Sequence, residues 1–254
     1  MKIRMLGTGY GECKIKKRVS KDYRGRGGVV IDDFLLIDAP DDIFKAAEEL
    51  GFSDIFRTIS DVLITHSHAG HFSARVIDKM AKKRRIRVYA SREVLVQIGD
   101  NPNITKYEIC AFMKFGVGGY NVVALPASHS TDILTEECFN FLLLGDRRLL
   151  YALDGGFTEL GAFNVLRQVT LDAVICDTAL GKGELGERAF YHNDIYTLAR
   201  IKALLEKCGA ATEKTRFILS HIPTDKKISI HDELSPVAAE YGMTLAYDGY
   251  FARI

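Results

Sequence analysis

Residues 65–72, THSHAGHF, hold three of the seven histidines of this 254-residue sequence. His66, His68 and His71 come directly after an apolar run, residues 62–64, that is typical of a buried strand. Side chains alternate between the two faces of a strand, so two histidines separated by one residue can point the same way. Neutral imidazole is a ligand of zinc, iron, manganese and nickel. The spacing predicts a metal site at a strand end; the alternative is a polar loop whose histidines hydrogen-bond locally.

Other residues that can bind metal also follow apolar, strand-like runs. They are His129, Asp154, Asp177 and His221. Strand ends at one edge of a sheet are where residues far apart in sequence converge, so we expect these side chains to lie near the histidine motif. His192 precedes a predicted helix; it is either part of the same site or an exposed residue at the start of the helix.

The order of the predicted elements indicates the fold class. Short apolar runs bounded by Gly, Asp or Pro predict strands at 3–6, 28–31, 34–37, 62–65, 86–89, 121–125, 139–144, 149–153, 173–176, 216–220, 244–247 and 250–252. Capping residues and helical spacing predict helices at 41–50, 73–83, 91–98, 193–207 and 231–241. Many strands with interspersed helices favour two packed sheets over regular strand–helix alternation. No linker or repeat interrupts the chain, so we expect one domain, 1–254, of the α/β (α+β) class.

Composition and charge exclude several classes of protein. Apolar residues make up 47% of the chain, which argues against disorder, and the net charge of +1 gives no overall attraction to nucleic acid or membranes. No stretch approaches the roughly 18 apolar residues of a membrane span, and the N-terminus lacks the apolar stretch of a signal peptide. We expect a cytoplasmic protein that binds a small molecule, with homodimerisation left open.

Two basic runs stand out against this even balance. The first contains Lys14, Lys16, Lys17, Arg18, Lys21, Arg24 and Arg26, and the second contains Lys82, Lys83, Arg84, Arg85 and Arg87. Each is either a solvated segment or a rim that attracts phosphate-bearing substrates. The first run is the better candidate for a rim, because it leads toward the expected site.

The histidine motif and the later strand ends together resemble the metallo-β-lactamase-fold hydrolases. In that superfamily, HxHxDH after a strand is followed by a distant His, a distant Asp and a distant His, each after its own strand. The matching residues are, in order, His66, His68, His71, His129, Asp154 and His221. The resemblance covers essentially the whole chain and implies a four-layer αββα sandwich, with helices on the outer faces of two mixed sheets.

Shorter segments are similar to the phosphodiesterase branch of this superfamily, which includes phosphoribosyl cyclic phosphodiesterase and, more remotely, the tRNA-maturation nucleases. These segments are LGTGYG (6–11), LIDA (36–39), YHND (191–194), LSHI (219–222) and AYDG (246–249). The resemblance implies hydrolysis of a phosphodiester, with His192 contacting a substrate phosphate or protonating the leaving group. The cysteine-rich zinc site of the cyclic phosphodiesterase has no counterpart, because only Cys13 stands in that region.

The resemblance also implies one or two divalent transition metal ions (Zn, Mn, Fe or Ni) that activate water. The implied ligands are His66, His68 and His129 for one ion and His71 and His221 for the other, with Asp154 bridging them and taking part in catalysis. The chain departs from the family at Gly70, which occupies the place of the motif aspartate. That carboxylate would bind the second ion, so we expect a weak second site.

Three functions remain open from the sequence. The first is a phosphodiesterase, the second a hydrolase of lactones, thioesters or β-lactams, and the third a metal-binding homologue weakened in catalysis at Gly70. The ligands alone do not separate them, because one fold hosts several chemistries. We expect Asp38 to be a buried acceptor that positions the metal loop, Asp177 and Asp248 to have supporting roles, and His231 to lie outside the site.

Overall fold

Two seven-stranded mixed sheets pack face to face in the computed structural model, which describes residues 1–11, 20–82, 84–183, 186–224 and 230–254. The first sheet has the order β16 (Phe251–Arg253), β1 (Lys2–Gly7), β3 (Gly28–Ile31), β4 (Leu35–Ile37), β5 (Asp61–Leu63), β6 (Ile86–Ala90) and β7 (Ile104–Glu108). The second has the order β15 (Met243–Leu245), β13 (Arg216–Ser220), β12 (Ala173–Asp177), β11 (Arg148–Ala152), β10 (Phe139–Leu144), β9 (Tyr120–Pro126) and β8 (Lys114–Val117). A short pair, β2 (Gly9–Tyr10) and β14 (Ile222–Pro223), links the two halves of the chain beside the site.

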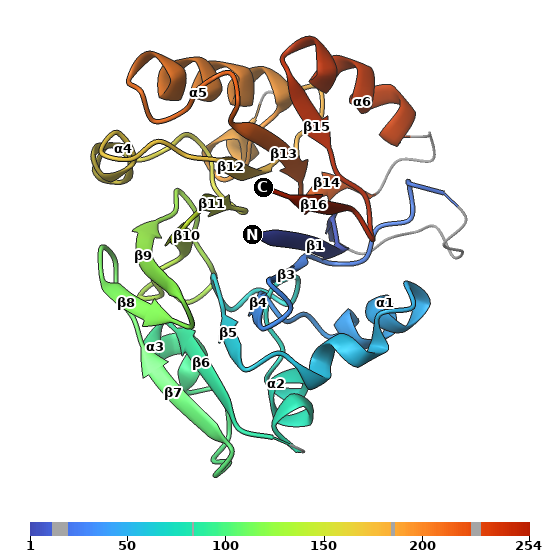
Figure 1. Ribbon diagram of the computed structural model, residues 1–254, viewed down its shortest axis with the longest axis vertical. Coiled ribbons are helices and arrows are strands. Elements are labelled where there is room, and N and C mark those ends of the chain that lie inside the picture. Colours follow the sequence, from blue (N-terminus) through green and yellow to red (C-terminus); the bar gives the residue numbers. More distant parts are fainter. Residues whose placement is uncertain (12–19, 83, 184–185, 225–229) are drawn as a thin grey trace.

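Helices cover the outer face of each sheet (Figure 1). The first sheet carries α1 (Ile43–Glu49), α2 (Ala74–Ala81) and α3 (Arg92–Leu95), and the second carries α4 (Leu160–Leu166), α5 (Ile195–Lys207) and α6 (Ile230–Glu240). Two 3₁₀ turns, η1 (Ser53–Arg57) and η2 (Glu187–Phe190), lie in the connections. This is the four-layer αββα sandwich that the sequence predicts.

Buried apolar side chains fill the spaces between the layers. The central cluster joins the inner faces of the sheets, for example Ile37 and Leu63 of the first sheet with Tyr151 and Ile175 of the second. Separate clusters lie under the helices on each outer face. Burial on both faces explains why the central strands are continuous apolar runs, which makes them easy to recognise in the sequence.

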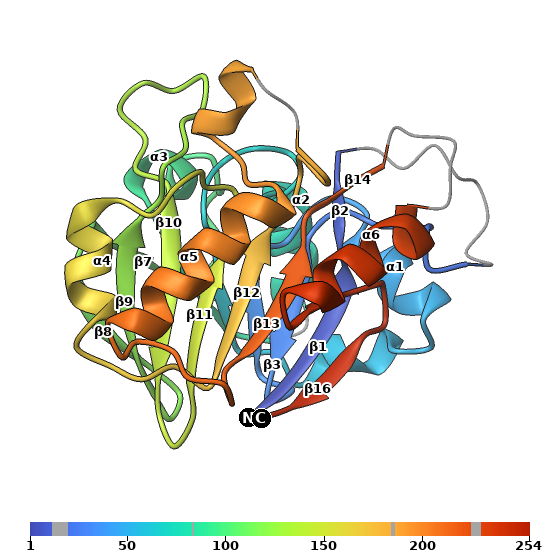
Figure 2. The ribbon, with the colours of Figure 1, turned by 90° about the horizontal axis from the view of Figure 1, so that it is seen from above.

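Parallel pairing of the central strands brings the site residues to one edge. In the first sheet β4, β5 and β6 run parallel, and in the second β11, β12 and β13 do so. Their carboxyl ends therefore open onto the same edge of each sheet. Figure 2 shows the connections gathered at that end of the sandwich, while the two termini lie side by side at the other end. There the Met1 amino group donates to the Ile254 carbonyl.

Local chemistry accounts for several element boundaries. Asp32 and Asp33 both adopt positive φ (46° and 64°) in the turn that joins β3 to β4, and the Phe34 amide closes this turn by donating to the Ile31 carbonyl at 3.2 Å. Helix α5 begins with Asp194 as its N-cap, whose carboxylate accepts a hydrogen bond from the Thr197 amide at 2.6 Å. The sequence-based choice of Asn193 as the cap was wrong by one residue, because the Asn193 amide instead donates to the Gly155 and Gly156 carbonyls.

The sequence analysis missed the edge strands β7 and β8, the short pair β2 and β14, and helix α4. Residues in the edge strands are largely half-buried or exposed, so these strands lack an apolar run. Helix α4 contains a glycine and an asparagine, both poor helix formers, within seven residues. The helix predicted at 91–98 is also shorter, since α3 ends at Leu95. Across the part of the chain that the structure describes, no helix is long and apolar enough to cross a bilayer.

Candidate metal centre

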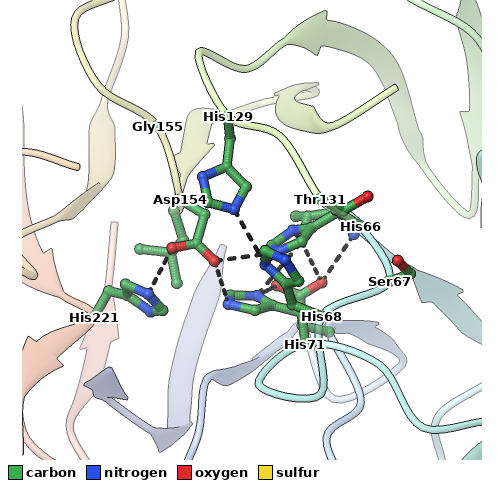
Figure 3. Close-up of polar contacts among 12 residues, drawn as sticks. His66, Ser67, His68, His71, His129, Thr131, Asp154, Gly155 and His221 are labelled. Atoms are coloured by element: carbon green, nitrogen blue, oxygen red, sulfur yellow. Dashed lines mark hydrogen bonds and ion pairs between the residues drawn. The ribbon is translucent and has the colours of Figure 1, made fainter. Parts of the chain in front are cut away.

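Histidine and aspartate side chains cluster at the sheet edge where the parallel strands end (Figure 3). One group consists of His66, His68, His129 and Asp154, a second of His71, Asp154 and His221, and a third of Asp154, Asp177 and His192. Within each group the potential ligand atoms lie within 4.8 Å of one another. The structure thus brings together every residue that the sequence predicts as a metal ligand or catalytic group.

Asp154 lies at the centre of the cluster. Its Oδ2 is 2.6 Å from His71 Nε2 and 3.3 Å from His66 Nε2, while its Oδ1 is 2.6 Å from His221 Nε2. The residue follows β11 with a positive φ of 48°, a conformation that non-glycine residues seldom adopt. Burial alone would raise the pKa of Asp154, but the imidazoles of His221 and His71 hold it well below its usual value. The carboxylate is therefore ionised and faces two sets of histidines.

The first group is partly open to solvent. His66 is buried, whereas His68 and His129 are half-buried. His68 Nδ1 lies 3.0 Å from His66 Nε2 and 3.2 Å from His129 Nε2. Burial lowers the pKa of His66 to about 3 and that of His129 to about 4, so both rings are neutral at neutral pH. A neutral imidazole is the form that binds a metal ion.

Asp38 fixes the orientation of the loop of residues 65–71 through hydrogen bonds to Thr65 and His71. It is fully buried, and its Oδ1 accepts hydrogen bonds from the backbone amide and the hydroxyl of Thr65, both at 2.9 Å. Its Oδ2 lies 2.8 Å from His71 Nδ1 and accepts from the Tyr151 hydroxyl at 3.0 Å. Burial alone would lower the pKa of His71, but the carboxylates of Asp154 and Asp38 together raise it to about 10. Asp38 is thus the buried, positioning acceptor that the sequence predicts, and it leaves His71 Nε2 facing the cluster.

A glutamate that the sequence analysis did not single out connects the loops of His66–His68 and His129. The Glu136 carboxylate accepts hydrogen bonds from Ser67 and Thr131. Ser67 stands between the first two histidines, and Thr131 lies two residues after His129. Glu136 lies in a polar segment with no motif of its own, so only the folded structure reveals this connection.

His192 and Asp177 form a buried pair beside the cluster. His192 is only 6% exposed, which excludes the alternative of a solvated histidine at the start of the helix. Its Nδ1 donates to Asp177 Oδ2 at 2.7 Å and lies 3.3 Å from Asp154 Oδ1. Burial opposes protonation of His192, but its hydrogen bond to Asp177 raises its pKa overall. Asp177 also accepts from the Ala179 amide at 2.7 Å, so it has the supporting position expected of it.

The remaining predicted polar residues lie away from the cluster. Asp248 accepts from the amide and hydroxyl of Thr8 and from the Gly25 amide, so it supports the turn after β1. His231 is buried elsewhere, with its Nδ1 3.3 Å from the Arg24 guanidinium, and is outside the site as expected.

The prediction that the first basic run forms a rim beside the site is wrong for Arg24. The Arg24 side chain is fully buried and donates to the Thr8 hydroxyl and the Ala246 carbonyl. Lys14, Lys16, Lys17 and Arg18 of the same run, and Lys83 of the second run, lie outside the described residues. In the second run Arg87 pairs with buried Asp61 at 2.6 Å, at the sheet edge opposite the site. Arg24 and Arg87 therefore supply no exposed positive charge beside the site.

The donor set fits a transition metal. Among the described residues, buried atoms without a hydrogen bond include His129 Nδ1, Asp154 Oδ1 and both ring nitrogens of His221. The 2.6 Å approach of His221 Nε2 to Asp154 Oδ1 does not have hydrogen-bond geometry. Buried polar atoms normally have a partner, and a cation between the imidazoles and the carboxylate would provide one.

Comparisons with known proteins identify the fold. No protein-family model matches the sequence, and no curated protein matches it. The structure is similar to YhfI, a metallo-β-lactamase fold protein from Bacillus subtilis, with a TM-score of 0.77 and 15% identity over 99% of this chain and 98% of YhfI. It is also similar to a diphosphatase of the PhnP family, with a TM-score of 0.74 and 18% identity over 100% of this chain and 97% of that one.

Zn²⁺-bound PqqB from Methylobacterium extorquens is a third similar structure, with a TM-score of 0.73 and 17% identity over 100% of both chains. This chain has the metallo-β-lactamase fold. At such low identities the similarity establishes the fold alone, so the chemistry has to be argued from the residues of the site.

Gly70, between His68 and His71, is the position at which the sequence departs from the pattern of the family it resembles. A Cβ atom at residue 70 would meet no atom within 4 Å, and the backbone there does not adopt the positive φ that favours glycine. Neither the space nor the backbone conformation therefore requires a glycine. The second group, His71, Asp154 and His221, has one carboxylate and two imidazoles among the described residues.

Proposed function

We propose that this protein is a metal-dependent hydrolase that cleaves a phosphodiester in a small molecule. The observation that carries the proposal is the convergence of six histidines and two aspartates on one edge of a metallo-β-lactamase fold. This arrangement needs five separate strand ends to meet, which a merely structural polar cluster would not require.

The first two of the three groups, joined through Asp154, would hold the metal ions. His66, His68, His129 and Asp154 provide a full set of ligands for one ion, whereas the second group has fewer ligands and is the weaker site. When bound, the ions would lower the pKa of water from about 15.7 toward about 7 and stabilise negative charge that develops during the reaction. Zinc is consistent with the Zn²⁺-bound PqqB, but the same ligands also suit manganese, iron or nickel.

The protein itself supplies orientation and a positioned proton donor. Asp38 and Glu136 hold the loops that carry the candidate ligands. The histidine side chains on these loops therefore reach the cluster with little conformational freedom. Asp177 binds His192 through Nδ1, which leaves Nε2 for a substrate. From that position His192 contacts a phosphate oxygen or protonates the departing oxygen.

Two features favour a phosphodiester over other esters. One is the His192–Asp177 pair in the YHND segment, which is similar to the phosphodiesterase branch. The other is the similarity to a diphosphatase of the PhnP family along nearly all of both chains. A phosphate-containing small molecule is accordingly the partner that we propose.

The test is metal analysis combined with an assay of bis-p-nitrophenyl phosphate hydrolysis under Mn, Zn or Ni supplementation. We expect a bound transition metal and turnover that is lost in His66→Ala. His231→Gln is the matched control, because it alters the one histidine that lies outside the cluster. Protein that binds no transition metal and hydrolyses no phosphodiester under these conditions would refute the proposal.

Gly70 supports a second candidate, a metal-binding homologue with weakened hydrolysis. The missing carboxylate removes a ligand of the second ion and an acceptor that orients water. Metal binding without turnover of phosphodiesters, lactones or thioesters would support this candidate. Faster turnover of a lactone or thioester than of any phosphodiester would instead replace the reaction proposed above.

A further inference from the structure

Two aromatic residues, Tyr10 and Tyr191, and one cation, Arg188, border the metal cluster. Tyr10, in β2, packs edge-on against His192 and His221, with ring centroids 4.9 and 5.0 Å apart. The Arg188 guanidinium lies 5.1 Å from the centroid of the Tyr10 ring. On the other side, the Tyr191 ring lies edge-on to His129 at 6.1 Å. These contacts place a positive charge and an exposed ring directly beside the candidate catalytic and metal-binding histidines.

The backbone that carries Arg188 and Tyr191 is fixed to the loops of the site. The Ser128 hydroxyl, next to His129, donates to the Phe190 carbonyl at 3.1 Å. A Cβ at Gly156 would approach the same carbonyl to 2.4 Å, so the glycine allows the segment to pack closely behind Asp154. The His192 amide donates to the Arg188 carbonyl at 2.9 Å, which closes the turn. Residues 187–191 therefore have a defined position relative to the metal ligands.

The chemistry of these side chains suits an aromatic phosphate ester. Arg188 is exposed, and guanidinium binds phosphate through charge-assisted hydrogen bonds. Tyr191 is 41% exposed, so one face of an amphipathic ring is available beside the half-buried His129. Rings of this kind stack on nucleobases. An alkyl phosphodiester would bind the Arg188 guanidinium but would have no aromatic group to stack on the Tyr191 ring.

We propose that Arg188 and Tyr191 determine specificity for phosphodiesters that carry an aromatic group, such as a nucleobase or an aryl ester. Arg188 binds a non-bridging phosphate oxygen while supported by Tyr10, and Tyr191 stacks on the aromatic group. This inference rests on the proposed phosphodiesterase function, because it assumes that the phosphate occupies the metal cluster.

Equilibrium binding tests the proposal without turnover. The probes are adenosine 5′-monophosphate, ribose 5-phosphate and adenosine, titrated by calorimetry into metal-loaded protein. We expect Arg188→Gln to weaken binding of both phosphates by about 10-fold, the low end for a charge-assisted hydrogen bond at an exposed site, and to leave adenosine unaffected. We expect Tyr191→Leu to weaken the nucleotide by about 5-fold, through lost stacking, and to leave ribose 5-phosphate unchanged.

Two matched variants remove an arginine or a tyrosine ring away from the site, and so control for the loss of a charge or a ring as such. Arg85→Gln removes an exposed arginine just before β6, at the edge opposite the site, and Tyr241→Leu removes a ring that is 38% exposed beside Tyr196. Equal binding of nucleotide and ribose 5-phosphate by the unmodified protein would overturn the inference. So would an Arg188→Gln protein that behaves like Arg85→Gln.

Hydrolysis measured in parallel separates this inference from the proposed function. The expected binding pattern without hydrolysis of bis-p-nitrophenyl phosphate would refute the enzymatic proposal and leave the aromatic phosphate site standing. If the Arg188→Gln and Arg85→Gln proteins hydrolyse bis-p-nitrophenyl phosphate with equal efficiency, the role of Arg188 is refuted and the enzymatic proposal stands.

Discussion

Replacing Asp38 by asparagine should separate the positioning of the metal loop from the stability of the fold. The carboxylate accepts from the amide and hydroxyl of Thr65 through one oxygen and faces His71 Nδ1 and the Tyr151 hydroxyl through the other. An asparagine oxygen can replace only one of these acceptors, so its NH₂ group would face His71 and Tyr151. If the His71 ring then moved its proton to Nε2, that nitrogen could no longer bind a metal.

The magnitude follows from the bonds that are lost. Hydrogen bonds to a charged group contribute about 1.5–3 kcal/mol each, and Asp38 is fully buried, so no solvent replaces them. The hydroxyl of Tyr151 can rotate to become an acceptor and recover part of the loss. We therefore expect a decrease of about 3 kcal/mol in the free energy of unfolding. Loss of a partner that orients a metal ligand should also weaken metal binding by about 10- to 100-fold.

Urea denaturation in the presence of chelator measures the first effect, and competition with a chromophoric chelator measures the second. Asp61→Asn is the matched control: Asp61 is equally buried, pairs with Arg87 at 2.6 Å and stands at the start of β5, at the end opposite the site. It should lose stability and keep its metal affinity. If Asp38→Asn shows the same pattern as this control, Asp38 supports the fold only and the positioning argument is refuted.

Three further variants and one treatment test other parts of the site. Gly70→Asp should fold normally, because its Cβ meets no atom within 4 Å, and metal analysis should show occupancy rising toward two ions per chain; unchanged occupancy would mean that residue 70 does not reach the second ion. Asp177→Asn removes the partner of His192 at 2.7 Å and should lower kcat for bis-p-nitrophenyl phosphate by about 100-fold with KM nearly unchanged; a shift in KM alone would argue for a substrate-binding role. Gly156→Ala places a Cβ 2.4 Å from the Phe190 carbonyl, so it should raise KM for aryl phosphodiesters while metal content stays constant; a loss of metal would instead show that the loop of Asp154 moved. Chelation should lower the melting temperature, because metal ions bind the folded state, and an unchanged melting temperature in calorimetry would contradict metal binding at the cluster.

The candidate metal ligands could be predicted because each follows a buried apolar strand, and all but His129 follow a strand that has a parallel neighbour. Such strands are continuous apolar runs, and a polar residue at the end of the run is conspicuous in the sequence. The position of Asp154 after β11 and that of His221 after β13 were recognisable for this reason. Parallel pairing then brings these ends to one edge, so a correct fold class was enough to predict the cluster.

Other features depend on packing between distant segments and leave no local signal. Arg24 looks like a surface cation in the sequence, yet the fold buries it against Thr8 and the Ala246 carbonyl. Glu136 is one of several acids in a polar loop, and only the approach of Ser67 gives it a structural role. Tyr10 likewise becomes a neighbour of the site because β2 pairs with β14 from the far end of the chain. The pattern of the sequence predicts elements and their ends, but not which side chains meet across them.

The backbone shows that the frame of the site does not depend on the residue at position 70. Among the described residues, Asp38, Asp154 and His221 all adopt positive φ (63°, 48° and 56°) directly or shortly after the strands β4, β11 and β13. Such conformations cost about 1–3 kcal/mol each for non-glycine residues and persist only where surrounding structure holds them. Here the strands that precede them are paired on both sides in the sheets, and each turn directs a side chain toward the site. The strain is thus maintained by the sandwich, whereas a Cβ atom at residue 70 would lie in open space. We therefore expect a carboxylate at that position to change the number and affinity of bound metal ions without altering the geometry of the other candidate ligands.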